Sequence, residues 1–246
     1  MKIIISPAKK MNIDNDSLAY RDYPVFIDKA HKLMNTMKSF NYDDLKTLLS
    51  CNDKIAEQNY LRYKDMDLER NLTPAILAYE GIQYQYMAPR VFDYENYEYI
   101  ENHLRILSGF YGILKPFDGV VPYRLEMQTK LKTDYCNNLY DYWKDDIYNE
   151  LVSDDKVIIN LASKEYSKVI EKYLSEDDIF ITCTFASIID GKLKTKATEA
   201  KMARGEMVRF MAENNIEDVE EIKKFNKGGF LYNKELSSES NYVFIK

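Results

Sequence analysis

The sequence predicts an α/β fold, a single mixed domain over residues 1–246 in which helices flank a central β-sheet. Two short β-branched runs predict buried strands: residues 2–5, which end at Ser6-Pro7, and residues 157–161, after which Ser163 can cap a helix. Helical patterns lie between and after these runs, and no linker rich in Pro, Gly or Ser separates them. The chain also has no internal repeat, so one domain is expected.

Hydrophobic periodicity and turn signals predict the remaining elements. Helical periodicity marks residues 28–39, 43–49, 53–63, 95–107, 140–151 and 198–214. A longer strand is expected at residues 179–189, and the Asp190-Gly191 turn predicts a hairpin to residues 192–194. Gly228-Gly229 and residues 242–245 predict a further strand pair near the C-terminus.

The glycines of GFYG, Gly109 and Gly112, raise the question of a phosphate-binding loop. Neither the P-loop pattern nor the dinucleotide-binding fingerprint occurs in the chain. Leu104 and Leu107 are expected to end a helix that Ser108-Gly109 caps. Gly112 then lets the chain turn again, so we interpret the stretch as scaffold.

The composition excludes several classes of protein. The 34 Lys and Arg residues against 40 Asp and Glu residues give a net charge of -6, so any site for a polyanion must be a local patch. Three cysteines without a C-x-x-C spacing favour a reducing cytoplasm over a disulfide framework or a zinc site. No apolar run reaches the roughly 20 residues of a membrane helix. The two isolated histidines offer little material for a metal site. We expect no metal, no cofactor and no membrane partner.

Residues 45–59 match the pattern of a helix-hairpin-helix element, which we place at about residues 43–63. Its apolar and small positions are Leu45, Leu48, Cys51 and Ala56. In such an element the backbone N–H groups of the hairpin and of the second helix face a DNA phosphate. Ser50 and Asn52 stand where the hairpin glycines usually are. The alternative is an ordinary corner between two helices, capped by Asn52 or Asp53.

Residues 191–210 form a locally basic segment in an acidic chain. Its six basic residues, against two glutamates, are Lys192, Lys194, Lys196, Lys201, Arg204 and Arg209. Alternate lysines of a strand project from one side, and on the following helix Lys201 and Arg204 lie opposite the apolar stripe that contains Met207. These cations can form one phosphate-binding face. The alternative is a basic face exposed to solvent.

Residues 123–126 also place charge on one side of an extended segment. Alternation puts Arg124 and Glu126 on one face, with Tyr123 and Leu125 on the other. An arginine that a neighbouring carboxylate orients can bind a phosphate through two hydrogen bonds. The alternative is an internal salt bridge without a ligand.

Seven separated motifs together resemble one protein family. They are ISPAKK (5–10), LRILSGFYGILKPFD (104–118), PYRLEM (122–127), LYDYW (139–143), NLASKEY (160–166), DGKLK (190–194) and AKMARGEMVRF (200–210). In order and spacing they are similar to the YaaA peroxide-stress proteins. The resemblance implies an α/β fold of its own kind, with a helix-hairpin-helix element and a positively charged cleft suited to double-stranded DNA. It also implies a role in surviving hydrogen peroxide by limiting unincorporated iron.

The resemblance further implies which residues bind phosphate. It assigns the hairpin to residues 50–54, with Ser50, Asn52 and Lys54. The cleft cations that it implies are Lys9, Arg124, Lys192, Lys194, Lys201, Arg204 and Arg209, and Lys10 adds charge where relatives often have threonine. The leading hypothesis is therefore a cytoplasmic protein that binds double-stranded DNA without sequence preference.

Two other functions are compatible with parts of the sequence. One is an enzyme acting on a nucleotide-like or phosphorylated small molecule in the same cleft, lined by Lys9, Arg124 and the turn at residues 160–165. Polar groups available there are Ser6, Ser163 and Glu165. No histidine base or recognisable nucleophile pair accompanies them, so catalysis stays an open question. The other is an iron-binding protein, which the lack of a Glu-x-x-His pattern and of cluster-spaced cysteines disfavours.

Overall fold

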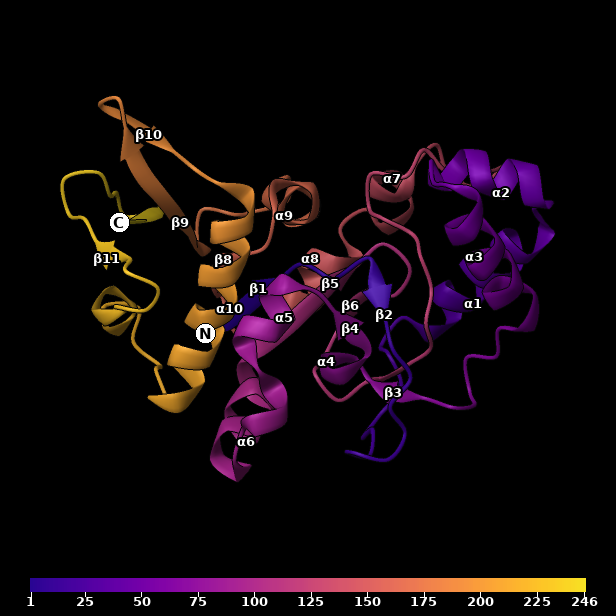
Figure 1. The fold of residues 1–246 in the computed structure, drawn as a ribbon, viewed down its shortest axis with the longest axis horizontal. Coiled ribbons are helices and arrows are strands. Elements are labelled where there is room, and N and C mark those ends of the chain that lie inside the picture. The colour runs from indigo at the N-terminus through magenta and orange to yellow at the C-terminus, as the bar shows by residue number, and fades with distance from the viewer.

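The structure, a computed structural model, describes residues 1–246, and its largest element is a mixed β-sheet (Figure 1). The strands follow the order β11-β12-β9-β8-β1-β5-β6, and β10 pairs with β9 outside this row. Their bounds are β1 (Lys2–Ile5), β5 (Leu104–Ser108), β6 (Gly112–Leu114), β8 (Val157–Leu161), β9 (Ile179–Ile189), β10 (Lys192–Lys194), β11 (Leu231–Tyr232) and β12 (Asn241–Ile245). The five strands β12, β9, β8, β1 and β5 are parallel, and β6, β10 and β11 are antiparallel to their neighbours.

Helices surround this sheet, which confirms the predicted α/β class. They are α1 (Ile27–Ser39), α2 (Tyr42–Leu49), α3 (Asp53–Asp65), α4 (Ala75–Ala78), α5 (Ile82–Met87), the short 3-10 helix η1 (Pro89–Val91), α6 (Tyr94–His103), α7 (Leu139–Trp143), α8 (Asp146–Leu151), α9 (Lys164–Glu171), α10 (Ala197–Glu213) and the 3-10 helix η2 (Glu221–Lys224). Two small sheets pair β2 (Lys10–Met11) with β4 (Tyr79–Glu80) and β3 (Thr73–Pro74) with β7 (Gly119–Val120). Helices α1, α2, α3 and α10 lie close to their predicted bounds.

Two predicted helices are wrong in part. The helix expected at residues 95–107 ends at His103, and residues 104–108 form the buried strand β5, so Ser108-Gly109 ends a strand and caps no helix. Pairing with β1 decides this, because a short apolar run fits either element locally. The helix expected at residues 140–151 is divided into α7 and α8, because Lys144 between them has a positive φ of 48°.

The carboxyl ends of the parallel strands meet at one edge of the sheet. Ile5 at the end of β1 pairs in register with Leu161 of β8 and with Ile106 of β5. The next residues are joined directly: Ser163 N donates to Ser6 Oγ at 2.8 Å, and Ser6 Oγ donates to Ser163 Oγ at 3.2 Å. Ser163 thus takes the predicted N-cap position of α9, although its hydroxyl bonds Ser6 and not the helix. In open α/β sheets, ligands bind at this edge.

Two glycines allow backbones to approach closely near this edge. A Cβ atom on Gly109 would lie 2.4 Å from the carbonyl oxygen of Leu125, so glycine lets the segment around Leu125 cross the end of β5. A Cβ atom on Gly205 of α10 would lie 2.1 Å from the carbonyl oxygen of Gln83 in α5. Glycine therefore lets α10 and α5 cross backbone to backbone. These contacts gather residues 123–126, α5 and α10 beside the carboxyl edge of the sheet.

Helices α1, α2 and α3 form a group at one end of the molecule, at the right of Figure 1. Tyr63 of α3 donates its hydroxyl to the carbonyl oxygen of Arg124 at 2.9 Å and ties this group to the rest of the fold. In the turn between α2 and α3, Ser50 has φ 46° and Asn52 caps α3 by accepting from Ile55 N at 3.0 Å. This geometry fits a helix-hairpin-helix element and an ordinary corner equally, so the predicted element stays a prediction.

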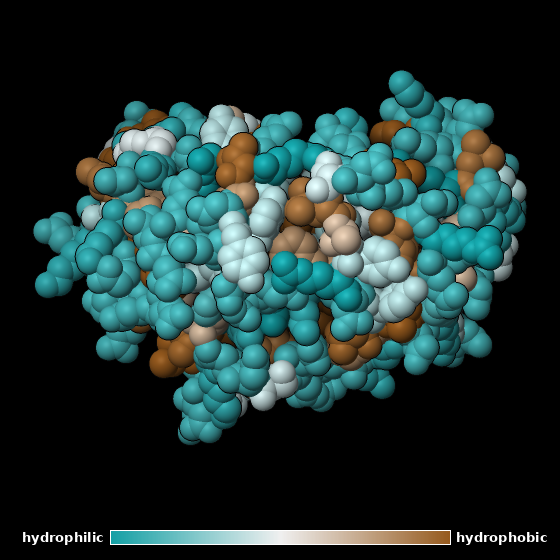
Figure 2. All heavy atoms as spheres, turned by 90° about the horizontal axis from the view of Figure 1, so that it is seen from below, coloured by the Kyte–Doolittle hydropathy of each residue, from teal (hydrophilic) through white to brown (hydrophobic).

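The surface is mainly hydrophilic and the core mainly apolar. Hydrophilic side chains cover most of the face seen in Figure 2, and apolar side chains appear there in small groups. The buried core is continuous from Ile4 of β1 to Trp143 of α7. None of the helices combines the length and the apolar character needed to cross a bilayer.

Candidate functional site

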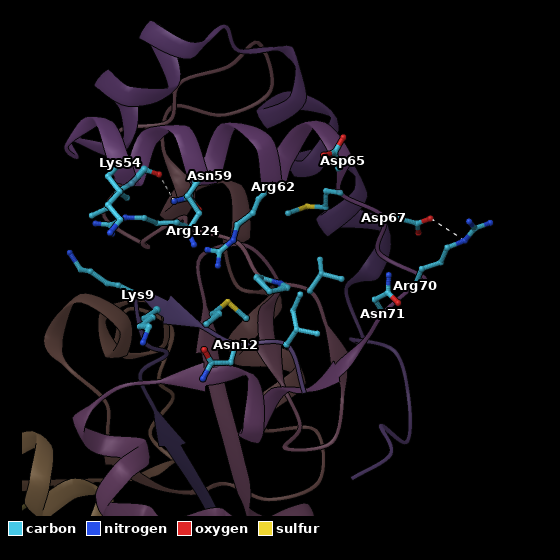
Figure 3. A pocket seen from close by; sticks show the side chains of 18 residues that line it. Lys9, Asn12, Lys54, Asn59, Arg62, Asp65, Asp67, Arg70, Asn71 and Arg124 are labelled. Carbon is cyan, nitrogen blue, oxygen red and sulfur yellow. Dashed lines mark hydrogen bonds and ion pairs between the residues drawn. The ribbon is translucent and has the colours of Figure 1, made fainter. Parts of the chain in front are cut away.

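A cleft of about 930 Å³, which we call the main cleft, lies between α3 and β2. Its basic side chains are Lys9, Lys10, Lys54, Arg62, Arg70 and Arg124, and its acidic side chains are Asp65 and Asp67. Lys54, Asn59 and Arg62 come from α3 and gather near Arg124, while Lys9 approaches from the other wall (Figure 3). Basic groups from three separate parts of the chain therefore meet in this cleft.

Two further hollows share Lys9 and Arg124 with the main cleft. The inner chamber, of about 420 Å³, lies at the carboxyl edge of the sheet and is lined by residues 6–10, 80–84 and 123–126 with Ser163, Glu165, Tyr166, Lys201 and Arg204. The outer groove, of about 710 Å³, lies beside α2 and Ser50, and residues 128–132 line its other side. Because the same two cations line all three hollows, they form one branched depression, which we call the basic depression.

Arg124 stands where the three hollows join. Its Nη2 atom lies 3.1 Å from Glu126 Oε1, and Lys9 Nζ lies 2.9 Å from the same oxygen. Tyr123 and Leu125 are buried, so Arg124 and Glu126 share the outward face that alternation predicted. The salt bridge and the cleft-facing arginine, posed above as alternatives, thus occur together. One carboxylate orients two cations and can neutralise only one of them.

Helix α10 supplies two cations that form no ion pair. Lys201 and Arg204 both line the inner chamber. Burial lowers the pKa of Arg204, and its Nε atom has no hydrogen-bond partner. Charged side chains are seldom buried without a partner, since desolvation costs several kcal/mol per ion. Arg204 is therefore a candidate binding residue.

Unpartnered buried donors concentrate around the inner chamber. Six buried side-chain polar atoms in the protein have no hydrogen-bond partner. The three donors among them are Arg124 Nε, Arg204 Nε and Gln83 Nε2, and all three residues line the inner chamber. The three acceptors belong to Asn59, Glu101 and Asp178, which lie outside this chamber. Since buried polar atoms are nearly always paired, a cluster of free donors indicates a site that receives acceptor atoms.

Glu165 places a carboxylate opposite these donors. It lines the inner chamber, and its Oε1 accepts from Gln128 N at 3.2 Å. Burial raises the pKa of Glu165, and the neighbouring Glu126 raises it further. The hydroxyls of Ser6 and Ser163 lie in the same chamber. A carboxyl group with a raised pKa can exchange a proton with a ligand.

The basic depression carries a positive excess that the whole chain lacks. Its lining includes six Asp and Glu side chains and ten Lys and Arg side chains, against a net charge of -6 for the protein. The ten are Lys9, Lys10, Lys54, Arg62, Arg70, Arg124, Lys130, Lys132, Lys201 and Arg204. A concave surface of one sign attracts a polyanion even when the protein as a whole is acidic.

The predicted site residues divide into two groups. Those that line the basic depression are Lys9, Lys10, Ser50, Lys54, Arg124, Lys201 and Arg204. Asn52 is exposed in the turn before α3, and Lys192, Lys194 and Arg209 lie outside all three hollows. Local acids pair with two of these: Lys194 Nζ lies 3.6 Å from Asp190 Oδ2, and Arg209 Nε lies 2.6 Å from Glu213 Oε1.

Some lining residues were not predicted from the sequence. Asn59 donates Nδ2 to the Ile55 carbonyl at 2.8 Å while its Oδ1 has no partner, and burial lowers the pKa of Arg62. Ile55, Asn59 and Arg62 lie at positions i, i+4 and i+7, on one face of α3, so polar residues on an inward stripe were the available signal. Gln83 carried no such signal, because its position depends on how α5 crosses α10.

Side chains suited to metal or thiol chemistry are dispersed. No group of three or more His, Cys, Asp or Glu side chains is arranged to hold a metal ion. All three cysteines are unpaired. Burial raises the pKa of the Cys51 thiol, and it raises the pKa of Cys183 to about 12, so neither is a reactive thiolate at neutral pH.

The fold and the site define an α/β protein with a basic depression at the carboxyl edge of its parallel strands. Helices α2 and α3 line the other side of this depression. Comparison with known proteins gives the family. The profile of the family described as "Peroxide stress protein YaaA" matches residues 1–236. The chain therefore belongs to this family, as its motifs indicated.

Curated relatives match along the full chain. A UPF0246 protein of Desulfitobacterium hafniense (strain Y51) is 61% identical over 246 residues, which cover 100% of this chain and 98% of the relative. A UPF0246 protein of Agathobacter rectalis is 57% identical over 244 residues, which cover 99% of this chain and 98% of the relative. A UPF0246 protein of Pediococcus pentosaceus is 53% identical over 246 residues, which cover 100% of this chain and 98% of the relative.

Proposed function

We propose that this member of a peroxide-stress family binds double-stranded DNA in the cytoplasm, without sequence preference. The observation that carries the proposal is the gathering of ten basic side chains in one branched depression of an acidic protein. Contacts to phosphates supply most of the affinity in nonspecific DNA binding and read no bases. A continuous basic depression therefore favours a polyanion as ligand.

In this proposal the turn between α2 and α3 is a helix-hairpin-helix element that holds one phosphate. Ser50 has the left-handed conformation that a hairpin glycine would adopt, and the N–H groups of Asp53 and Lys54 donate to no group of the protein. Free N–H groups at a helix N-terminus favour an anion. The carboxylate of Asp53 would repel an anion at this position. Lys46 offsets that negative charge, because its Nζ atom lies 2.5 Å from Asp53 Oδ1.

Two parts of the proposal reach beyond the basic depression. Lys192, Lys194 and Arg209 would contact phosphates only where the duplex extends past it, because none of the three lines a hollow. Limitation of free iron is proposed as the cellular consequence, by analogy with the family. Measurement of chelatable iron in peroxide-treated cells with and without the protein tests this part separately.

Fluorescence anisotropy with a labelled duplex that carries no terminal phosphates tests the DNA proposal. With 6 to 10 phosphate contacts, affinity should fall by roughly 10³-fold or more between about 50 and 200 mM salt. Arg124→Met should weaken binding, because Arg124 lines all three hollows. Lys234→Met removes an exposed charge outside these hollows and should not. Absent or salt-independent binding would overturn the proposal.

A second candidate is an enzyme acting on a nucleotide-like or phosphorylated small molecule in the inner chamber. It is supported by the position of Ser6 and Ser163 at the carboxyl edge of the sheet and by the raised pKa of Glu165. These groups do not define a reaction. The test is whether a small phosphorylated ligand raises the melting temperature while duplex DNA fails to displace it. Full displacement by duplex DNA would argue for the first candidate.

A further inference from the structure

We infer that the inner chamber is a binding site for a phosphate monoester, such as the terminal phosphate of a nucleic-acid strand or of a free nucleotide. The inference rests on the proposed function in treating this chamber as a branch of the same phosphate-binding depression. It goes further by assigning a separate group, a terminal phosphate, to a defined set of residues. Those residues are Arg124, Arg204, Lys201 and Gln83.

The donors of the chamber come from three separate elements of the fold. Arg124 is supplied by the extended segment after β7, Gln83 by α5, and Arg204 by α10. Each carries a buried nitrogen without a hydrogen-bond partner, and Gln83 is 7% exposed. A tetrahedral group with several terminal oxygens offers acceptors in several directions at once, whereas a planar carboxylate offers two in one plane. The arrangement of donors therefore fits phosphate.

The charges of the chamber distinguish a monoester from the phosphodiester of a continuous strand. Its lining has five cations and three carboxylates, a surplus of two positive charges. Lys10 Nζ lies 2.7 Å from Glu80, and Lys9 and Arg124 share Glu126. A phosphodiester carries one negative charge, but a monoester carries about -1.5 to -2 at pH 7 and has a third terminal oxygen. The surplus thus matches a monoester.

The chamber connects to the rest of the depression, so a strand end can reach it. Lys9, Lys10 and Arg124 line both the inner chamber and the main cleft. At about 420 Å³ the chamber falls in the size range of small-molecule sites, so it has room for a phosphate and part of the attached nucleoside. The same chemistry is offered by a free nucleotide and by a strand end, and the experiment separates the two.

Isothermal titration calorimetry in phosphate-free buffer compares two dinucleotides that differ in one group. The first is pTpT, which has a 5′ phosphate monoester, and the second is TpT, which has only the internal diester. We expect pTpT to bind at least tenfold more tightly, since its terminal phosphate can accept charge-assisted hydrogen bonds that TpT cannot. Equal affinity for the two compounds, or no binding of pTpT, would overturn the inference.

Variants assign the effect to the chamber. Arg204→Met should abolish the preference for pTpT, whereas Lys234→Met should retain it. Because the buried Nε atom of Arg204 has no hydrogen-bond partner, Arg204→Met should keep or raise the melting temperature in phosphate-free buffer. A purely structural role would instead lower it. If Arg204→Met does not fold, Gln83→Met replaces it, with the same expected loss of preference. A variant that folds and keeps the full preference would contradict the assignment.

Duplexes with and without 5′ phosphates separate this inference from the proposed function. Tighter binding of the phosphorylated duplex supports a strand end as the natural source. Binding of pTpT without any binding of duplex supports a free nucleotide and removes the DNA proposal while the chamber assignment stands. Duplex binding that ignores the terminal phosphate, together with equal affinity for pTpT and TpT, removes the chamber assignment while the DNA proposal stands.

Discussion

The two halves of the basic segment at residues 191–210 carry similar charge and have different surroundings. In the hairpin half, Lys192, Lys194 and Lys196 are exposed, and two of them lie near local acids: Lys194 near Asp190 at 3.6 Å and Lys196 near Glu199 at 3.2 Å. In the helical half, the exposed Lys201 and the half-buried Arg204 line the inner chamber without an acidic partner. Basic residues that are close in sequence are thus divided between a solvated surface and a site.

The difference shows that local charge in a sequence is a weaker signal of a site than burial without a counter-ion. An exposed ion pair contributes only about 0–1 kcal/mol to stability and is screened by salt. Exposed lysines of this kind therefore need no ligand to explain them. A half-buried arginine without a partner lowers the stability of the fold. Binding of a ligand by Arg204 would explain why an arginine stands at this position.

The largest expected contrast concerns the two glycines of this segment. Gly205→Ala should lower the free energy of unfolding by roughly 3 kcal/mol or more, because its Cβ would lie 2.1 Å from the Gln83 carbonyl oxygen. Gly191→Ala meets no neighbouring atom but keeps φ +69°, so it should cost about 1–2 kcal/mol. Urea denaturation measures both. Equal costs would mean that α5 and α10 do not cross closely.

The next contrast is in DNA affinity. Lys201→Met should weaken duplex binding by up to about tenfold and reduce the slope of log K against log salt by about 1. Lys194→Met should leave both nearly unchanged, because Lys194 lies outside the basic depression. Anisotropy titrations at several salt concentrations measure these values. If Lys194→Met reduces the slope as much as Lys201→Met, the hairpin lysines contact DNA as the sequence predicted.

A smaller contrast is expected in stability between two arginines of α10. Arg209 pairs with Glu213 at 2.6 Å on the surface, so Arg209→Met should lower stability by about 0.3–0.5 kcal/mol. Arg204→Met should be neutral or stabilising in phosphate-free buffer, since it removes a half-buried guanidinium whose Nε atom has no hydrogen-bond partner. Thermal unfolding of both variants beside the wild type tests this. A marked loss of stability in Arg204→Met alone would assign Arg204 a structural role.

The smallest contrast is in the pH dependence of stability. Burial raises the pKa of Glu165, so its contribution to stability is lost as pH rises above 4.5, the value it would have when unfolded. Lys246 and Lys196 lower the pKa of Glu199, so its contribution is lost as pH falls below that value. Glu165→Gln should therefore stabilise the protein at pH 7, and Glu199→Gln should slightly destabilise it. Melting curves from pH 4 to 8 give, for each variant, the difference in melting temperature from the wild type as a function of pH. The two differences should change with pH in opposite directions, and a change in the same direction would contradict the assignment.

Much of the fold was predictable because its signals are local. The strands at residues 2–5, 157–161 and 179–189 have the predicted bounds, and the Asp190-Gly191 hairpin is present. Strand β5 was missed because Leu104–Ser108 continues a helical pattern. It becomes a strand by pairing with β1, about 100 residues away in the chain. A contact this distant leaves no trace in local periodicity.

The kinds of residue in the candidate site were predictable from the sequence. Which of the predicted residues line the site was less predictable. Alternation placed Arg124 beside Glu126, and helical geometry placed Lys201 beside Arg204. No local pattern separates Arg204 from Arg209, which lie five positions apart on one helix. Folding separates them, because Arg204 lines the inner chamber while Arg209 lies outside it and pairs with Glu213.

By itself the sequence determined the α/β class, most element bounds and the family, because periodicity, turns and ordered motifs are properties of neighbouring residues. Tertiary structure decided which cations meet and which carboxylates neutralise them. The reason is physical: electrostatic attraction depends on distance and on burial, and both are set by segments such as residues 6–10, 123–126 and α10 that only folding brings together.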